Sequence, residues 1–85
     1  MNELKVKNLG MVGMMIDYYT FQFGNMKRIS FEDLKEVLGL VGKLGELSNK
    51  LSRSVEEDEV NEIIEKCDVI ISDLEKVYEL IQAKQ

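Results

Sequence analysis

Two short stretches of the chain carry acidic residues at a spacing that could bind a metal ion. Glu65 and Asp68 stand three residues apart, and Glu46 stands three residues after Lys43. Residues three apart are neighbours on one face of a helix. Two such pairs on adjacent helices would form a cluster of oxygen ligands, which Mg²⁺ prefers. We therefore predict that Glu46, Glu65 and Asp68 converge in one pocket. Lys43, the fourth member of the two pairs, is predicted to point into or beside this pocket and to pair with one of the three carboxylates.

The composition limits the class of protein. At 85 residues, the chain is predicted to be one domain, residues 1–85. Eleven basic and sixteen acidic side chains give a net charge of −5, which disfavours binding to a nucleic acid polymer. Histidine, the commonest general base, is absent, and no catalytic residue can be assigned. A single cysteine, Cys67, suits a reducing cytoplasmic compartment. No segment reaches the roughly 20 apolar residues that span a membrane.

The elements that must position these residues are helices. Apolar residues recur at the helical period and nowhere alternate, so we predict an all-α fold. The three helices are expected near residues 2–23, 31–53 and 55–83. Ser30 is a candidate N-cap of the second helix, and Ser54 with Glu57 forms an S-x-x-E capping box for the third. Cys67 lies at the centre of the third helix's apolar face and is expected to be a buried, unreactive thiol.

Two further groups of residues allow a structural and a functional interpretation. Gly39, Gly42 and Gly45 interrupt the second helix and cost about 2–3 kcal/mol of helix propensity. Either close helix packing compensates for this cost, or a ligand or a neighbouring backbone needs the space beside residues 42–46. The aromatic side chains near the end of the first helix are expected to pack in the core or at an interface, with stacking on a nucleotide base as the alternative. They are Tyr18, Tyr19, Phe21 and Phe23.

The third helix predicts self-association. At 1.5 Å per residue it would be roughly 45 Å long, too long for one short partner from the same chain to cover. Val69 and Leu80 lie off its main apolar stripe and would be exposed in a monomer. We therefore expect a homo-oligomer, most simply a homodimer, with the third helix at its centre.

The order of residues in two segments resembles a known family. Gly42–Leu47 reads GKLGEL and Glu65–Ile70 reads EKCDVI, with a polar segment between them. The stretch from Leu38 to Leu74 thereby resembles the MazG-like all-α nucleoside triphosphate pyrophosphohydrolases, whose small members carry G-E-x-G-E-[LV] followed by E-L-G-D-V-[LI]. The match covers somewhat under half of the chain. Each short motif is weak alone, whereas their order, glycine framework and spacing together are moderately specific.

The resemblance implies an oligomeric helical bundle whose ExxE and ExxD motifs bind Mg²⁺ or Mn²⁺. The metal would hold a nucleoside triphosphate while water releases the monophosphate and pyrophosphate. Glu46, Glu65 and Asp68 occupy positions of the family's metal ligands. Lys43 departs from the pattern, because it replaces the first glutamate of ExxE and sets a positive charge beside the metal position.

Three functions follow from these observations. The first is a Mg²⁺-dependent nucleotide pyrophosphohydrolase with an altered site. The second is a non-catalytic MazG-like oligomer that serves as a binding or interaction module, with the Lys43 ammonium standing where a metal would. The third is a short acidic helical protein outside the family, which presents Val69 and Leu80 to another partner.

Overall fold

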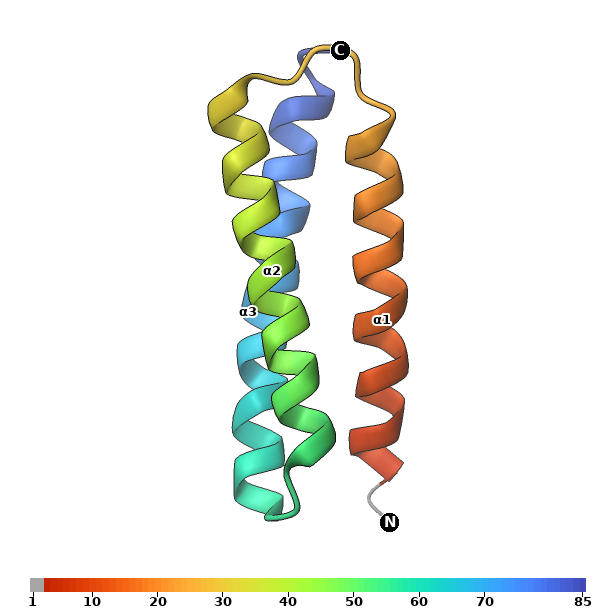
Figure 1. Ribbon diagram of the computed structural model, residues 1–85, viewed down its shortest axis with the longest axis vertical. Helices are drawn as coiled ribbons and strands as arrows, with labels where there is room; N and C mark the ends of the chain where they lie inside the picture. The colour runs from red at the N-terminus through yellow and green to blue at the C-terminus, as the bar shows by residue number, and fades with distance from the viewer. Residues whose placement is uncertain (1–2) are drawn as a thin grey trace.

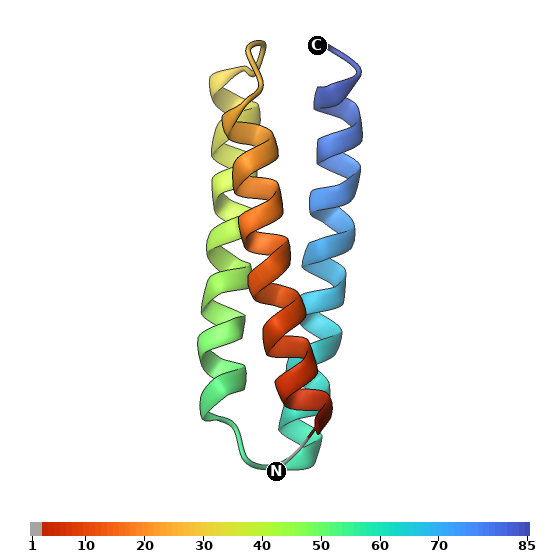
Figure 2. The ribbon, with the colours of Figure 1, turned by 90° about the vertical axis from the view of Figure 1, so that its right-hand side faces the viewer.

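The computed structural model describes residues 3–85, which form three α-helices and no strand. The helices are α1 (Glu3–Gly24), α2 (Phe31–Arg53) and α3 (Glu57–Gln82). They run antiparallel to their neighbours in sequence, in an elongated bundle of 43 × 17 × 16 Å (Figures 1 and 2). The all-α class is confirmed for the described residues, and the predicted helix ends there lie within two residues of the observed ones. The expected start at Asn2 lies outside the described residues.

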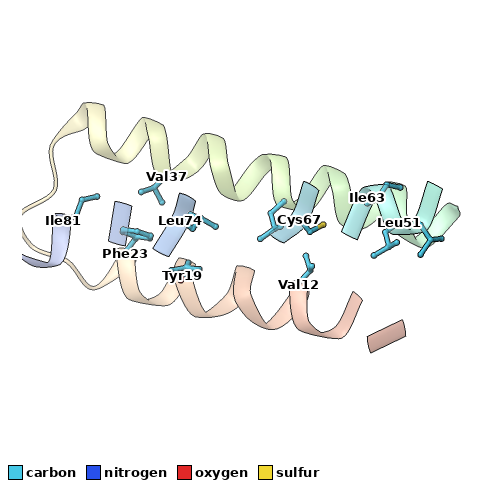
Figure 3. Close-up of a cluster of buried hydrophobic side chains, with 11 residues drawn as sticks. Val12, Tyr19, Phe23, Val37, Leu51, Ile63, Cys67, Leu74 and Ile81 are labelled. Carbon is cyan, nitrogen blue, oxygen red and sulfur yellow. The ribbon is translucent and has the colours of Figure 1, made fainter. Parts of the chain in front are cut away.

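One hydrophobic core runs along the bundle and takes side chains from all three helices (Figure 3). Apart from Ile63, the buried apolar positions of α2 and α3 repeat every seven residues, a spacing that returns side chains to one face of packed helices. The buried members are Val12, Tyr19, Phe23, Val37, Leu44, Leu51, Val60, Ile63, Cys67, Leu74 and Ile81. The predicted burial of Cys67 is confirmed.

An aromatic cluster joins α1 to the C-terminal half of α3. The ring of Tyr78 lies 6.0 Å from that of Tyr19 and 5.8 Å from that of Phe23, measured between centroids, and both pairs are edge-on. Tyr19 and Phe23 thus pack in the core, as expected. Tyr18 and Phe21 remain 48% and 67% exposed.

The first predicted cap is confirmed. Ser30 has extended backbone angles, and its hydroxyl accepts a hydrogen bond from the backbone N–H of Asp33 at 3.1 Å. The Asp33 carboxylate, at 3.3 Å from Lys84 Nζ, ties the start of α2 to the C-terminal segment. At the same end, the Gln85 side-chain amide donates to the Arg28 carbonyl at 2.8 Å, and its oxygen accepts from the Arg28 N–H at 3.1 Å.

The second predicted cap is wrong. Ser54 ends α2 instead of starting α3, because its backbone N–H donates to the Leu51 carbonyl. The N-cap of α3 is Glu56, whose side chain makes no capping hydrogen bond. The connection between the two helices is so short that the serine closes the preceding helix, and the expected capping box with Glu57 does not form.

Ser54 nevertheless holds this end of the bundle together. Its side chain is buried, and its hydroxyl oxygen lies 2.7 Å from the Lys50 carbonyl oxygen and 2.9 Å from Glu59 Oε1. The Lys5 ammonium of α1 donates to the Ser54 carbonyl at 2.5 Å. The α2–α3 connection therefore contacts all three helices.

Candidate functional site

An open groove with a volume of about 440 Å³ lies between α2 and α3. Its lining comes from these two helices, which share the most extensive contact of the bundle. Leu47 and Ile70 are half-buried in it, and Val69 is 59% exposed. The groove therefore offers apolar surface to a partner.

Charged side chains border this apolar surface. Lys43, Glu46 and Lys50 come from α2, and Lys66 comes from α3. Three lysines and one glutamate thus line the groove, a charge of +2 among its lining residues on a chain whose net charge is −5. The Lys66 ammonium is paired with the Glu62 carboxylate at its edge. Opposite charges attract across such a surface, and an acidic partner is favoured over a cation.

The structure brings two of the four predicted site residues together. Lys43 and Glu46 both line the groove, whereas Glu65 and Asp68 do not. Asp68 stands two residues after Lys66 and two before Ile70, so at about 100° per residue it points to roughly the opposite side of α3. All four side chains are exposed.

The predicted convergence of three carboxylates is not formed within one chain. Among residues 3–85, no group of three acidic, histidine or cysteine side chains is placed to hold a metal ion. In the same part of the chain, Lys43 forms no ion pair with Glu46, Glu65 or Asp68. A site built by two copies of the chain stays a prediction.

Two groove lysines were missed by sequence reasoning, which searched for carboxylates. Lys50 follows Lys43 by seven residues, and this spacing already places both on one face of α2. Lys66 lies inside the E-x-x-D motif, whose acidic positions are the ones that indicate a metal site. Its ammonium is 3.3 Å from Glu62 Oε1, with both side chains more than half exposed. Such an exposed ion pair one helical turn apart contributes only about 0.3–0.5 kcal/mol to stability, so either side chain can exchange this contact for one with a binding partner at little cost.

The glycines of α2 leave open space. A Cβ atom added at Gly39, Gly42 or Gly45 would meet nothing within 4 Å. Close packing within the chain therefore does not explain these glycines. The room beside residues 42–46 is available to a ligand or to a neighbouring molecule.

Cys67 is unsuited to nucleophilic chemistry. Its side chain is fully buried, and this burial, followed by the nearby Asp68 carboxylate, raises the pKa of the thiol. Because the thiolate is the reactive form, a raised pKa leaves the sulfur inert.

No protein-family model, curated protein or solved structure gives a significant match to this chain. The groove, the faces of the helices and the order of residues along them are the features of this chain that bear on its function.

Proposed function

We propose that this protein is a non-catalytic, MazG-like helical interaction module that acts as a homo-oligomer, most simply a homodimer. The observation that carries the proposal is the groove between α2 and α3, with its apolar floor and its rim of lysines. Val69 in this groove is 59% exposed, and Leu80, further along α3, is 67% exposed. Covering such surface gives association its main driving force.

The charges of the groove support an interaction module over a metal centre. Lys43 borders the same groove as Glu46, and its ammonium repels a dication at short range. The rim suits carboxylates instead. An amphipathic helix with acidic residues beside its apolar stripe satisfies both the floor and the rim.

Sedimentation equilibrium at micromolar concentration tests the proposal. The wild type is expected to sediment as a dimer, and Val69→Asp as a 9.8 kDa monomer, because the new charge would have to be buried in the contact. Met14→Asp adds the same charge at an apolar residue of α1 that is 70% exposed and lies outside the groove, and it is expected to remain dimeric. A wild-type protein that remains monomeric at these concentrations, or a Val69→Asp variant that dimerises normally, would overturn the proposal.

A second candidate is the Mg²⁺-dependent nucleoside triphosphate pyrophosphohydrolase, with Glu46, Glu65 and Asp68 as ligands. Besides the residue order, the lysine rim supports it, because ammonium groups beside Glu46 could also pair with phosphate oxygens. Titration with Mg²⁺ or Mn²⁺, followed by incubation with a panel of nucleoside triphosphates, separates the two functions. Release of pyrophosphate by the wild type would establish the enzyme.

Lys43→Glu is the matched variant for this comparison. It restores the four-carboxylate pattern of the family and is expected to raise Mg²⁺ affinity, because it removes a positive charge and adds an oxygen ligand. Equal, tight metal binding and equal hydrolysis by both proteins would mean that the lysine is no impediment. If neither protein binds metal, the carboxylates form a solvated face.

A further inference from the structure

A stripe of α3 continues the surface of the groove along the whole helix. Its members follow one another at alternating intervals of four and three residues, which keeps them on one face. We call this stripe the outer ridge. It consists of Glu62, Lys66, Val69, Asp73, Lys76 and Leu80. Lys66 and Val69 line the groove, and all six lie outside the buried core.

The outer ridge has an unusual distribution of charge. α3 carries nine acidic and two basic side chains, and both basic ones, Lys66 and Lys76, lie on the ridge. Glu62 and Asp73 balance them, so the four charges of the ridge sum to zero. The other seven acidic residues of α3 lie elsewhere on the helix. Because its charges sum to zero, two copies of the ridge can approach each other without net repulsion, and opposite charges can be paired by a two-fold axis.

We propose that the outer ridge docks against the outer ridge of a second copy of this chain, with the two α3 helices antiparallel and their two-fold axis at Val69. This inference rests on the homo-oligomer proposed above and adds the partner's orientation. Glu62 stands seven residues before Val69 and Lys76 seven after, so Glu62 faces the partner's Lys76. Lys66 stands three before and Asp73 four after, so Lys66 faces the partner's Asp73.

The two-fold axis repeats each of these contacts, which gives four complementary ion pairs around a Val69 contact. An isologous interface has this self-complementary form. The same register overlaps α3 over its full length. Because the Glu62–Lys66 pair within the chain is exposed and weak, both groups can turn to the partner.

Other arrangements of the same two helices fit less well. Parallel helices in register would set Glu62, Lys66, Asp73 and Lys76 each against its own copy, so every ridge charge would meet a like charge. An antiparallel shift that places Val69 against the partner's Leu80 retains a contact between Asp73 and the partner's Lys76. It leaves Glu62 beyond the end of the partner helix and overlaps only about the C-terminal half of α3.

Charge exchange tests the ion pairs. Lys66→Glu and Asp73→Lys alone each set like charges face to face twice, and each is expected to raise the dimer Kd about tenfold. The double variant Lys66→Glu/Asp73→Lys restores opposite charges in the proposed register and is expected to return the Kd to within about threefold of wild type. Circular dichroism of each variant verifies that the helices are intact. Failure of the double variant to recover would overturn the register.

A disulfide tests the axis independently. Oxidation of Val69→Cys is expected to give a covalent dimer, because residues at the axis approach within the roughly 4.4–6.8 Å between Cα atoms that a disulfide needs. The wild type, with only the buried Cys67, and Met14→Cys, with an exposed thiol on α1, are the controls. A mixture of Val69→Cys and Leu80→Cys that cross-links faster than Val69→Cys alone would identify the shifted register.

The outcomes separate this inference from the proposed function. A monomeric wild type overturns both. A dimer that Val69→Asp dissociates, but that shows neither charge rescue nor a Val69→Cys disulfide, overturns the antiparallel register and leaves the interaction module standing.

Discussion

At the scale of single residues, Ser54 contributes more than a loop serine usually does. Its buried hydroxyl lies within hydrogen-bonding distance of the Lys50 carbonyl and of the Glu59 carboxylate, and its carbonyl accepts from Lys5. Removal of this hydroxyl would deprive the Lys50 carbonyl and the Glu59 carboxylate of their hydrogen-bond donor at the junction of the two helices.

We therefore expect Ser54→Ala to lower the free energy of unfolding by about 1–2 kcal/mol. Ser52→Ala is the matched control, since the Ser52 hydroxyl donates to the Asn49 carbonyl at the exposed surface. That variant is expected to change stability by less than about 0.5 kcal/mol. Urea unfolding of both measures the difference, and equal effects would mean that the Ser54 contacts contribute little.

Tyr19 gives the protein a pH dependence of known sign. Burial, followed by the Glu75 carboxylate, raises the pKa of its phenol above the usual value of 10.0. The unfolded chain therefore loses the phenolic proton at a lower pH than the folded protein does. The contribution of Tyr19 to the free energy of unfolding is therefore fully present below about pH 10, and it is lost as the pH rises through the raised pKa.

Tyr19→Phe removes this ionisation, so the loss of stability between pH 8 and pH 11 is expected to be smaller than in the wild type. Phe21→Leu, at a ring 67% exposed on the same helix, leaves every ionisable group in place and is the control, which is expected to lose stability as the wild type does. Urea unfolding at the two pH values measures each loss. An identical pH dependence in all three proteins would contradict the assignment to Tyr19.

At the scale of elements, α2 keeps three glycines that no contact within the chain explains. An interior glycine costs about 0.5–1 kcal/mol relative to alanine, because the unfolded backbone has more freedom to lose. Open space around a helical glycine means that alanine can be added without a clash.

Gly42→Ala is accordingly expected to raise the free energy of unfolding of the single chain by about 0.5–1 kcal/mol. Thermal unfolding at low protein concentration measures this gain. If a neighbouring molecule uses the space, the same variant weakens association while it stabilises the chain. A destabilised chain would instead mean that the helix around Gly42 tolerates no side chain.

The sequence was sufficient to place α2, because Ser30 can cap only one helix and the apolar residues after it keep one period up to Arg53. It was insufficient at Ser54, which suits the end of one helix as well as the start of the next. For the site, spacing placed Lys43 and Glu46 on one face. It did not fix the rotation of α3, and that rotation turns Asp68 away from the groove and Lys66 toward it.

At the scale of the whole molecule, a single core shared by three helices should make unfolding cooperative. Leu44 lies at the middle of α2, fully buried among residues of the core. Leu38, on the same helix, is 62% exposed. The two leucines therefore separate the energetics of the core from those of the surface.

Leu44→Ala is expected to cost about 2–5 kcal/mol, which combines lost burial with the cavity that remains. A bundle of this size has a total stability of the same order, so the variant is expected to be partly unfolded at 25 °C. Leu38→Ala should cost less than about 1 kcal/mol. Circular dichroism at 222 nm during urea titration measures both, and similar costs would contradict the placement of the core.

Within residues 3–85, none of the three helices is both long and apolar enough to cross a membrane. The exposed apolar surface of this bundle is instead divided among its faces, and Met14, Phe21 and Leu80 are each at least 67% exposed. Single apolar residues scattered over a surface are ordinary, whereas a contiguous patch marks an interaction site.

The aromatic cluster also gives the protein its own optical signal. Tryptophan is absent and the chain has three tyrosines, two of which, Tyr19 and Tyr78, face each other across α1 and α3. Their emission and near-ultraviolet dichroism therefore depend on whether α1 is seated on the rest of the bundle. Because this cluster lies on the core side of α3 and the outer ridge on its other side, the folding of α1 and the pairing of two molecules can be followed separately, without any attached dye.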